Sequence, residues 1–284
     1  MPAQGHDAAP DHFAAIAAEL GLQDPEITQL CGGLSNRSWR LRDARQDLVL
    51  RQSGNTQSLG ADRRAELAML EIAAAAGLAP PVLLARPAAG LLVTRYIDGR
   101  VLSREELRRP AMLARIGAWF VRLHALAPPQ GLAAIDFGAR AAGYLESLRG
   151  QLPAAFLQEL ERGLAARRAS LPVPRRLVAC HHDLHHLNIV DQGDAVLALD
   201  WEYAGPGDPA ADLAACIRYH ELEPELIEAM LDSYGGDSRL LRARLVPLCW
   251  IFDCLWFGWL EIATQQEFAV DAGRRQRLVD RLLP

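Results

Sequence analysis

The sequence of 284 residues predicts an α+β fold with two lobes, a small N-terminal lobe of antiparallel strands plus a helix and a larger, mostly helical C-terminal lobe. Short strand-like segments gather before residue 97, whereas longer helical patterns fill most of the remaining chain. A hairpin pattern between residues 180 and 200 interrupts the helical half. We therefore expect one lobe over residues 1–97 and a second over residues 98–284.

The first predicted strand follows a glycine turn. A Gly-Gly pair precedes an alternation of Trp39 and Leu41, which is typical of a strand with one buried face. Glycine is the default turn residue in many folds, so the pair alone carries little weight. Gly33, Ser35 and Asn36 nevertheless offer backbone and side-chain donors that suit phosphate oxygens.

The second strand and the following helix place an arginine and a glutamate where they can pair. The strand at 47–51 ends in Arg51, and its two leucines alternate inward. Residues 61–76 are rich in helix formers, with glycine and proline just beyond as a stop. Glu66, at the edge of the packed side of this helix, is the expected partner, and Glu71 is the alternative acid. A solvent-facing arginine at a strand end is the simpler interpretation.

The chain contains no lysine, so all 30 of its basic residues are arginine. This composition excludes a Walker A loop and any lysine Schiff base, because both chemistries need an amine. A phosphate clamp in this chain must therefore be an arginine, whose planar fork suits bidentate contacts with phosphate.

Residues 91–99 are predicted to form a strand that ends in a glycine turn, just before the helical half. The apolar residues of 110–126 follow helical spacing and are best explained as core. Residues 140–168 continue as helix with an interruption at Pro153, and 171–174 form a short extended lead-in to the next segment.

The segment of residues 180–200 carries the strongest chemical signal. Two short apolar runs flank a D-Q-G-D turn and predict a hairpin that folds Asp200 back beside Asn188. Two oxygen ligands near one point suit Mg²⁺, which takes few protein carboxylates and completes its shell with water and phosphates. Asp183, five residues before Asn188, is placed to accept the proton of an attacking hydroxyl. The spacing predicts phosphoryl transfer.

Four histidines in the same segment allow another interpretation. His181, His182, His185 and His186 could hold a transition metal, as in a His-Asp metal phosphohydrolase. Such sites usually draw ligands from several helices, whereas strand and turn signals flank this segment. We therefore expect His181 to be a packed residue that supports the loop, and the others to be loop residues.

The motif H-x-D-x-x-x-x-N at residues 181–188, followed by an aspartate after a hairpin, resembles the catalytic segment of the protein-kinase-like fold. With D-W-E-Y-A-G-P-G-D-P at residues 200–209 and D-L-A at 212–214, the chain resembles the aminoglycoside phosphotransferase and choline kinase superfamily, above all its choline and thiamine kinase branch. The resemblance implies a bilobal protein-kinase-like fold with a nucleotide-binding N-terminal lobe and a catalytic, substrate-binding C-terminal lobe.

The resemblance also implies a role for each motif residue. Asp183 matches the catalytic base, and Asn188 and Asp200 match the ligands of Mg²⁺. Asp212 matches the aspartate that braces the catalytic loop through its backbone. Without the resemblance, Asp212 would pass for an ordinary acid in the first turn of a helix.

In the N-terminal lobe, the resemblance implies an ATP site. Arg51 would clamp the nucleotide phosphates and pair with Glu66, beneath the glycine turn. The strand that ends near residue 97 would form the hinge whose backbone reads adenine. The residues expected to bind ATP are Gly33, Ser35, Asn36, Arg51, Glu66, Arg95, Tyr96 and Ile97.

A C-terminal segment rich in tryptophan is expected to shape the acceptor site. Phe252, Trp256 and Trp259 recur at helical spacing and share one face. Aromatic faces with nearby acids can hold a quaternary ammonium by cation–π attraction, and the segment resembles the aromatic C-terminal helix of choline kinases. Glu202 and Glu261 are the acids expected to contact the acceptor. An ordinary core helix would show the same stripe, so both interpretations stay open.

Charge and composition indicate a small-molecule substrate. The net charge of −5 and pI near 5.9 give no basic footprint for nucleic acid or an anionic membrane. The N-terminus lacks the basic and apolar regions of a signal peptide, and no uninterrupted apolar run is long enough to span a membrane, so a cytoplasmic location is expected. Five scattered cysteines fit reduced thiols rather than disulfides.

We therefore expect an ATP-dependent small-molecule kinase that uses Mg²⁺ and phosphorylates a hydroxyl of choline or a related cationic alcohol. Thiamine is the next acceptor, followed by an aminoglycoside or a sugar, although no dense acidic cluster follows residue 212. Two alternatives belong to other classes. One is a catalytically silent nucleotide-binding protein of the same fold, and the other is the metal phosphohydrolase.

Overall fold

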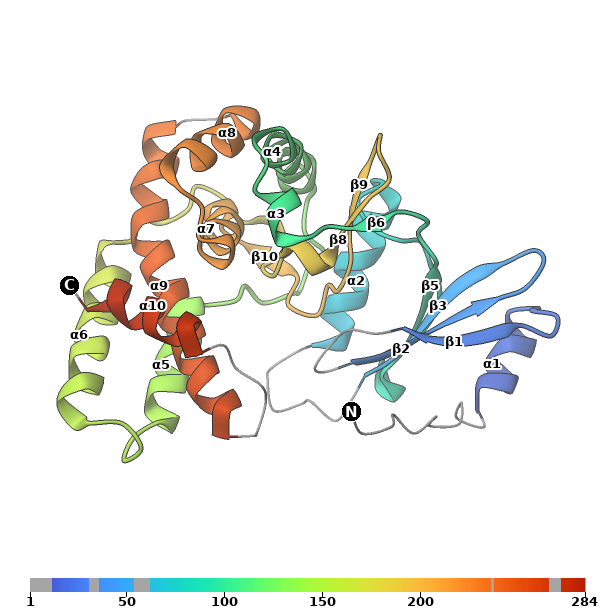
Figure 1. Cartoon of the computed structure of the whole chain (residues 1–284), viewed down its shortest axis with the longest axis horizontal. Coiled ribbons are helices and arrows are strands. Elements are labelled where there is room, and N and C mark those ends of the chain that lie inside the picture. Colours follow the sequence, from blue (N-terminus) through green and yellow to red (C-terminus); the bar gives the residue numbers. More distant parts are fainter. Residues whose placement is uncertain (1–11, 31–35, 54–61, 236–237, 266–271, 284) are drawn as a thin grey trace.

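A computed structural model describes residues 12–30, 36–53, 62–235, 238–265 and 272–283. The chain forms two lobes, with the strands of the N-terminal part on one side and the helices of the C-terminal part on the other (Figure 1). This arrangement confirms the predicted α+β fold with a small sheet-containing lobe and a larger helical lobe.

The N-terminal lobe is built on one antiparallel sheet. In the described residues the sheet has five strands in the order β1-β2-β3-β5-β4. Its strands are β1 (Glu26–Leu30), β2 (Asn36–Arg42), β3 (Asp47–Ser53), β4 (Val82–Arg86) and β5 (Leu91–Arg95). The helices of this lobe are α1 (His12–Glu19), α2 (Arg63–Ala75) and the short 3-10 helix η2 (Pro87–Ala89).

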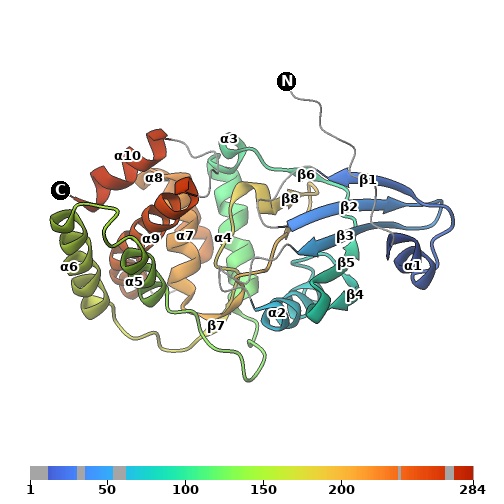
Figure 2. The same ribbon diagram turned by 90° about the horizontal axis from the view of Figure 1, so that it is seen from below.

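The strands of this sheet alternate between two environments. Trp39, Leu50 and Val93 pack with Phe13 of α1 in a core of their own. Figure 2 shows α1 toward the end of the sheet away from the C-terminal lobe and α2 nearer to that lobe. Because neighbouring side chains of a strand point to opposite faces, Arg51 points away from the core that holds Leu50 and reaches α2.

The C-terminal lobe is mostly helical around two small groups of strands. Residues 96–99 connect the two lobes. After them come β6 (Arg100–Val101), α3 (Arg104–Leu107), α4 (Pro110–His124), α5 (Phe137–Ser147) and α6 (Ala154–Ser170). The segment of residues 178–207 contains β7 (Val178–Cys180), the 3-10 helix η3 (His186–Asn188), β8 (Ile189–Asp191), β9 (Val196–Ala198) and β10 (Gly205–Gly207). The chain continues with α7 (Pro209–His220), α8 (Pro224–Tyr234), α9 (Ser238–Gln265) and α10 (Ala272–Leu282).

Pairing of the short strands confirms the predicted hairpin. β8 and β9 are antiparallel, with Ile189 opposite Ala198 and Asp191 opposite Val196. β6 pairs with β8 directly after the connector of residues 96–99. The chain therefore leaves the N-terminal sheet and pairs with β8 within a few residues. The boundary at residue 97 stays a prediction.

Helix α9 runs through the C-terminal lobe and contacts α5, α6, α7 and α10. Residues 239–264 have the length and composition of a membrane span, with a mean hydropathy of 1.5. However, 61% of this apolar stretch is buried inside the lobe. Burial of this kind is typical of a core helix, which needs apolar residues on most of its circumference. The four cysteines in the described residues are free thiols.

Candidate active site

The loop of residues 181–188 brings the three motif residues together. The backbone N–H of Leu199 donates to the carbonyl of Asn188 over 2.8 Å, which closes the base of the hairpin and sets Asp200 beside Asn188. The Nδ2 of Asn188 donates to the carbonyl of Asp183 over 3.0 Å. The candidate base and the two candidate metal ligands therefore share one corner of the lobe.

The carboxylate of Asp183 is suited to accept a proton. Its side chain is 29% exposed, and Oδ2 lies 3.8 Å from Nε2 of His185. Burial, and then repulsion by Asp200 and Glu202, raises the pKa of Asp183 well above its ordinary value, while Arg274 acts in the opposite direction. A carboxylate with a raised pKa is a stronger base toward a hydroxyl.

His181 supports the backbone of this loop. It is fully buried, its Nε2 donates to the carbonyl of Leu199 over 2.9 Å, and its Nδ1 accepts the backbone N–H of Asp183 over 3.3 Å. These two hydrogen bonds assign the neutral tautomer with a proton on Nε2. Burial lowers the pKa of His181 to about 4, so the ring is neutral near pH 7.

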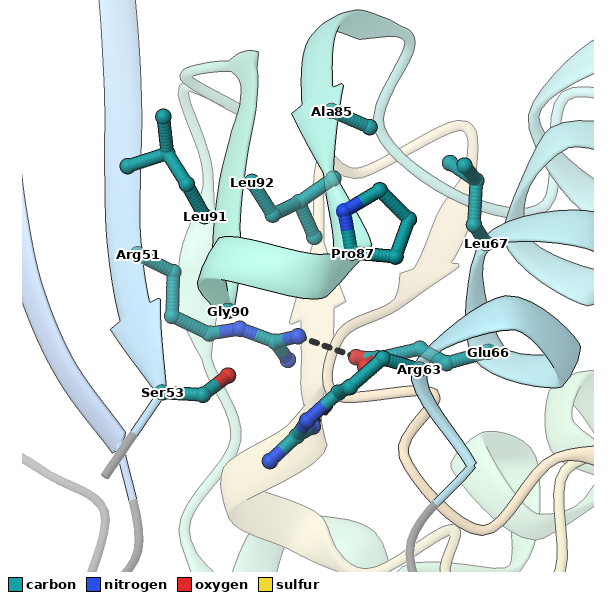
Figure 3. Close-up of a pocket in the computed structure, with 10 residues that line it drawn as sticks. All are labelled: Arg51, Ser53, Arg63, Glu66, Leu67, Ala85, Pro87, Gly90, Leu91 and Leu92. Atoms are coloured by element: carbon teal, nitrogen blue, oxygen red, sulfur yellow. Dashed lines mark hydrogen bonds and ion pairs between the residues drawn. The ribbon is translucent and has the colours of Figure 1, made fainter. Parts of the chain in front are cut away.

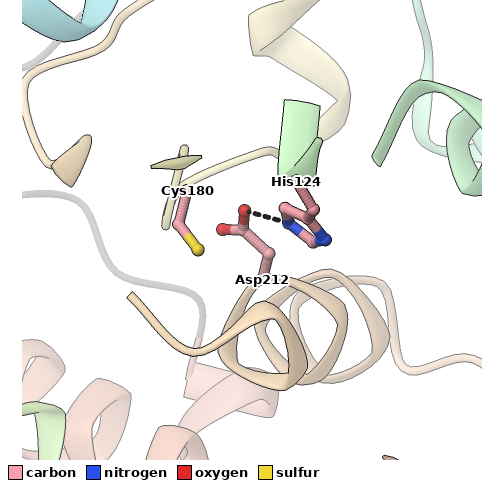
Figure 4. A group of neighbouring side chains, drawn as sticks. All are labelled: His124, Cys180 and Asp212. Carbon is pink, nitrogen blue, oxygen red and sulfur yellow. Dashed lines mark hydrogen bonds and ion pairs between the residues drawn. The ribbon is translucent and has the colours of Figure 1, made fainter. Parts of the chain in front are cut away.

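A second support comes from Asp212 in the first turn of α7. Its carboxylate accepts the backbone N–H groups of His181 and His182 over 3.0 and 2.5 Å and faces Nε2 of His124 at 3.0 Å. Figure 4 shows Asp212 bonded to His124, with the sulfur of Cys180 turned toward the same carboxylate. Burial alone would raise the pKa of Asp212, but His124 and the neighbouring imidazoles hold it at about 2. We call His124, Cys180 and Asp212 the Asp212 brace.

The histidines of the motif point to different partners. The Nδ1 of His182 faces the carbonyl of Tyr203 at 2.9 Å, and the ring of His185 stacks on Tyr219. Within the described part of the chain, the one group with metal-binding proximity is the Asp212 brace, whose carboxylate already accepts backbone hydrogen bonds. The geometry therefore does not favour the metal phosphohydrolase.

Asn188 and Asp200 have the chemistry of a magnesium site. Since Nδ2 of Asn188 is engaged by Asp183, its Oδ1 is left for another group, and no described residue donates to it. Burial, and then repulsion by Glu202, raises the pKa of Asp200 to about 6, although Arg51 lowers it. A donor set made only of oxygen fits Mg²⁺, and a bound cation would relieve the repulsion between the carboxylates.

Arg51 links this corner to the N-terminal lobe. Its Nη2 forms an ion pair with Glu66 of α2, and its Nη1 lies 3.1 Å from Oδ1 of Asp200. Arg63 adds a contact of 2.8 Å to the other oxygen of Glu66. Figure 3 shows the guanidinium of Arg51 turned toward Glu66. The alternative acid, Glu71, lies on an exposed part of the helix.

A cavity lies beside this ion pair, between the sheet and α2 (Figure 3). Arg51, Ser53 and Glu66 are among its lining residues. Among the described residues, the buried Nε of Arg51, Oγ of Ser53 and Oδ1 of Asn36 have no hydrogen-bond partner. Because unpaired buried polar atoms are costly, these atoms favour a polar ligand such as a nucleotide phosphate. Ser53 was missed from sequence, although it lies two residues after Arg51 on the same face of β3.

Fewer backbone N–H groups of the predicted hinge are available to adenine than the sequence suggests. The backbone N–H of Arg95 donates to Pro81 and that of Tyr96 to Asp47, both over 2.9 Å. Among the described residues, Ile97 is then the hinge position whose peptide N–H has no partner. Two other residues expected to bind ATP, Gly33 and Ser35, lie outside the described residues.

One part of the aromatic stripe of α9 packs in the core, and another part lies near the candidate site. Phe252 is 1% exposed and packs on Phe137 with 4.8 Å between ring centroids, so it belongs to the core. Trp259 is half-buried against the same core. Glu261 forms an ion pair with Arg275 of α10. The burial of Phe252 does not favour contact with an acceptor. The role of Glu261 in acceptor binding stays a prediction, although its carboxylate is paired with Arg275.

Glu202 contacts residues of the N-terminal lobe. Its Oε2 accepts Nδ2 of Asn36 over 3.4 Å and lies 3.3 Å from Nη1 of Arg63. The side chain is 8% exposed. Through Asn36 and Arg63 the carboxylate stabilises the contact between α2, β2 and the segment after β9. Its role in acceptor binding stays a prediction.

Trp256 is connected to the loop of residues 181–188 by Tyr219, which was not predicted from the sequence. The ring of Tyr219 lies 5.7 Å from that of Trp256 and stacks on His185 at 4.8 Å. The guanidinium of Arg274 lies 4.6 Å from the ring centroid of Tyr219 and 5.5 Å from that of Trp256. Tyr219 follows Asp212 by two helical turns and shares its face, which is a usable signal. No sequence pattern indicates Arg274.

Comparison with known proteins identifies a family that this chain matches. Residues 26–245 match the family model described as the phosphotransferase enzyme family. Over 94 residues the chain is 35% identical to a thiamine kinase from Escherichia coli O9:H4. That match covers 33% of this chain and 32% of the kinase, so the chain matches about a third of the length of its curated relatives.

Two crystal structures are similar over nearly the whole chain. A choline/ethanolamine kinase family protein from Mesorhizobium loti is 29% identical with a TM-score of 0.75, covering 95% of this chain and 93% of that one. The choline kinase LicA from Streptococcus pneumoniae is 21% identical with a TM-score of 0.78, covering 96% and 99%. At that lower identity the likeness shows the fold alone.

Proposed function

The chain belongs to the phosphotransferase enzyme family, and we propose that it transfers the γ-phosphate of ATP to a hydroxyl group of a small cationic alcohol, choline or a related amino alcohol. The observation that carries the proposal is the convergence of Asp183, Asn188 and Asp200 on one corner of the lobe, linked to the arginine–glutamate pair of the N-terminal lobe. Phosphoryl transfer needs these parts in one place.

In the proposed reaction the acceptor hydroxyl lies beside Asp183. Its oxygen forms a bond to the γ-phosphorus, the bond from that phosphorus to the bridging oxygen of ADP breaks, and the carboxylate takes the hydroxyl proton. The loop stays in position because His181 and the Asp212 brace hold its backbone. Positioning and charge stabilisation account for most of the catalysis in such reactions.

The nucleotide would be held between the lobes. Arg51 is the candidate phosphate clamp, since its guanidinium already pairs with a carboxylate from each lobe. Asn188 and Asp200 would hold Mg²⁺, which, when bound, neutralises charge on the phosphate oxygens. The unpaired polar atoms of Ser53 and Asn36 support a phosphate group nearby.

A cationic acceptor is supported by the surface next to the base. The guanidinium of Arg274 lies beside the rings of Tyr219 and Trp256, and aromatic faces that contact one organic cation suit another. Thiamine, which also carries a positive charge and a hydroxyl, is the second candidate, favoured by the 35% identity to a thiamine kinase. A polycationic aminoglycoside is less favoured, because Glu202 and Glu261 are engaged by the chain's own arginines. A cytoplasmic location stays a prediction.

The deciding experiment is ATP and Mg²⁺ turnover against choline, ethanolamine, thiamine, sugars and aminoglycosides, with the wild type and Asp183→Ala in parallel. We expect acceptor-dependent ADP release with choline or a related amino alcohol that is lost in the variant. Turnover only with an uncharged acceptor would contradict the cationic substrate. ATP binding without turnover on any acceptor would favour the silent nucleotide-binding protein, and equal turnover in the variant would exclude Asp183 as the base.

A further inference from the structure

We propose that Arg274 is a specificity-determining residue of the acceptor site. Its guanidinium occupies the position of the acceptor's cationic group, so a cationic acceptor must displace it before the hydroxyl can reach Asp183. The inference rests on the proposed function, because it concerns the substrate class of the same site. It assigns to α10 a part in choosing the acceptor.

The contacts of Arg274 are those of a bound organic cation. The guanidinium lies 4.6 Å from the ring centroid of Tyr219 and 5.5 Å from that of Trp256. Within the described ranges no carboxylate lies within ion-pairing distance of Arg274, whereas its neighbours Arg275 and Arg281 each pair with an acid. The aromatic faces therefore hold this cation in the way that they would hold a quaternary ammonium.

The position also adjoins the reacting groups. Tyr219 stacks on His185 with an interplanar angle of 18°, and His185 lies 3.8 Å from the carboxylate of Asp183. Arg274 is close enough to Asp183 to lower the pKa of that carboxyl. A small amino alcohol whose hydroxyl touched Asp183 would place its positive charge in the region that Arg274 now fills.

Helix α10 is held in place without the help of Arg274. Leu278 and Leu282 are buried in the core of the lobe. Arg281 contacts Asp253 at 3.0 Å, and Arg275 pairs with Glu261. The side chain of Arg274 can therefore turn away toward solvent while its helix stays in place.

Competition of this kind weakens the binding of cations in a measurable way. The apparent dissociation constant rises in inverse proportion to the fraction of molecules in which the site is open. Contact with two aromatic faces is worth roughly 1–2 kcal/mol, which corresponds to about a five- to thirtyfold weaker binding of a competing cation. A neutral acceptor that does not use the aromatic faces escapes this penalty.

The test is a titration of the purified full chain with tetramethylammonium and with choline, without ATP, followed by isothermal calorimetry. We expect Arg274→Ala to bind both cations about five- to thirtyfold more tightly than the wild type. Arg275→Ala is the matched control, because it removes the same charge one residue away and leaves the two rings covered. Its affinity for both cations should equal that of the wild type.

Unchanged or weaker binding by Arg274→Ala would overturn the inference, and so would an equal gain in Arg275→Ala, since net charge would then explain the effect. Arg274→Gln is measured beside Arg274→Ala as a second variant. The affinities are compared in a variant whose melting temperature equals that of the wild type, so that a folding defect does not explain the result. Turnover by the wild type without any gain in cation binding would reject the inference and keep the kinase. A gain in binding with no turnover on any acceptor would keep the inference and reject the proposed function.

Discussion

Arg51 of β3 and Asp200 after β9 form an ion pair across the two lobes, with 3.1 Å between Nη1 and Oδ1. The other nitrogen of the same guanidinium holds Glu66 of α2. One planar group thus connects the helix of the N-terminal lobe to a candidate metal ligand of the C-terminal lobe. An ammonium has three donors but no planar fork, so lysine would hold the two carboxylates with poorer geometry.

Arg51→Lys is therefore expected to raise the KM for ATP about ten- to hundredfold, the range for losing a hydrogen bond to a charged group. Steady-state kinetics at saturating acceptor measures it. Arg42→Lys is the matched control, since Arg42 lies on the same sheet, is exposed and has its guanidinium 3.8 Å from Asp47. A KM for ATP that is the same in both variants would contradict the phosphate clamp.

Asp183→Asn is expected to lower kcat about 10²- to 10⁴-fold, the usual contribution of a general base. The melting temperature should stay within a few degrees of the wild-type value, because the side chain is 29% exposed and the ring of His185, whose pKa burial lowers to about 3, is neutral and 3.8 Å away. Asp191→Asn, in the hairpin of the same segment, should keep most of the activity. Comparable losses in the two variants would argue against a specific role of Asp183.

Asp200→Asn is expected to raise the Mg²⁺ concentration for half-maximal turnover by roughly tenfold or more, because one of two protein ligands loses its charge. In the wild type, EDTA should abolish turnover and added Mg²⁺ should restore it. A magnesium titration of both proteins measures the effect. Turnover of the wild type that persists in EDTA would be incompatible with the proposed metal site.

The parts of the site that could be predicted from sequence depend on local periodicity. The hairpin follows from two short apolar runs around a turn, and it fixes the neighbourhood of Asn188 and Asp200. The pairing of Arg51 with Glu66 follows from a strand and a helix adjacent in sequence. In each case neighbouring elements determine the geometry, so spacing alone is informative.

The acceptor side could not be predicted in the same way. Phe252 and Trp256 share one face of α9, yet Phe252 is buried against α5 while Trp256 reaches α7, and spacing does not tell which part of a stripe lies at a site. Glu202 was expected to be available to a ligand, but its partner Arg63 is 139 residues away in the sequence. Such contacts depend on tertiary packing of distant elements.

Acid should destabilise the fold already between pH 6.5 and about 4, through buried neutral histidines. Burial lowers the pKa of His181 to about 4 and that of His220 to about 3, from 6.5. Since the unfolded chain binds these protons first, the stabilisation is complete above pH 6.5 and is lost as the pH falls toward the folded values. We expect a loss on the order of 2 kcal/mol per histidine from pH 7 to pH 5.

Urea denaturation at pH 7 and pH 5 measures this loss. His220→Gln should show a smaller difference between the two pH values, because the Nε2 of His220 accepts the backbone N–H of His186 over 3.2 Å only while the ring is neutral. Equal unfolding free energies of the wild type at both pH values would refute the assignment of neutral rings.

Asp212→Ala is expected to lower the free energy of unfolding by about 3–5 kcal/mol, the usual cost of removing one partner of a buried charged pair. The backbone donors of His181 and His182 would lose their acceptor. Glu225→Ala is the matched control, because Glu225 is an exposed first-turn acid of α8. Its loss should stay below about 1 kcal/mol. Similar thermal denaturation of the two variants would show that Asp212 is only an ordinary first-turn acid.

The guanidinium of Arg51 also decides which reagents can mark the cleft between the lobes. Reagents that acylate lysine amines have no target in this cleft, because this chain has no lysine. A dicarbonyl that condenses with guanidinium groups is the matching chemistry. Modification of Arg51 should then be slowed by ATP in proportion to occupancy, so the rate of inactivation by such a reagent reports nucleotide affinity even before an acceptor has been identified.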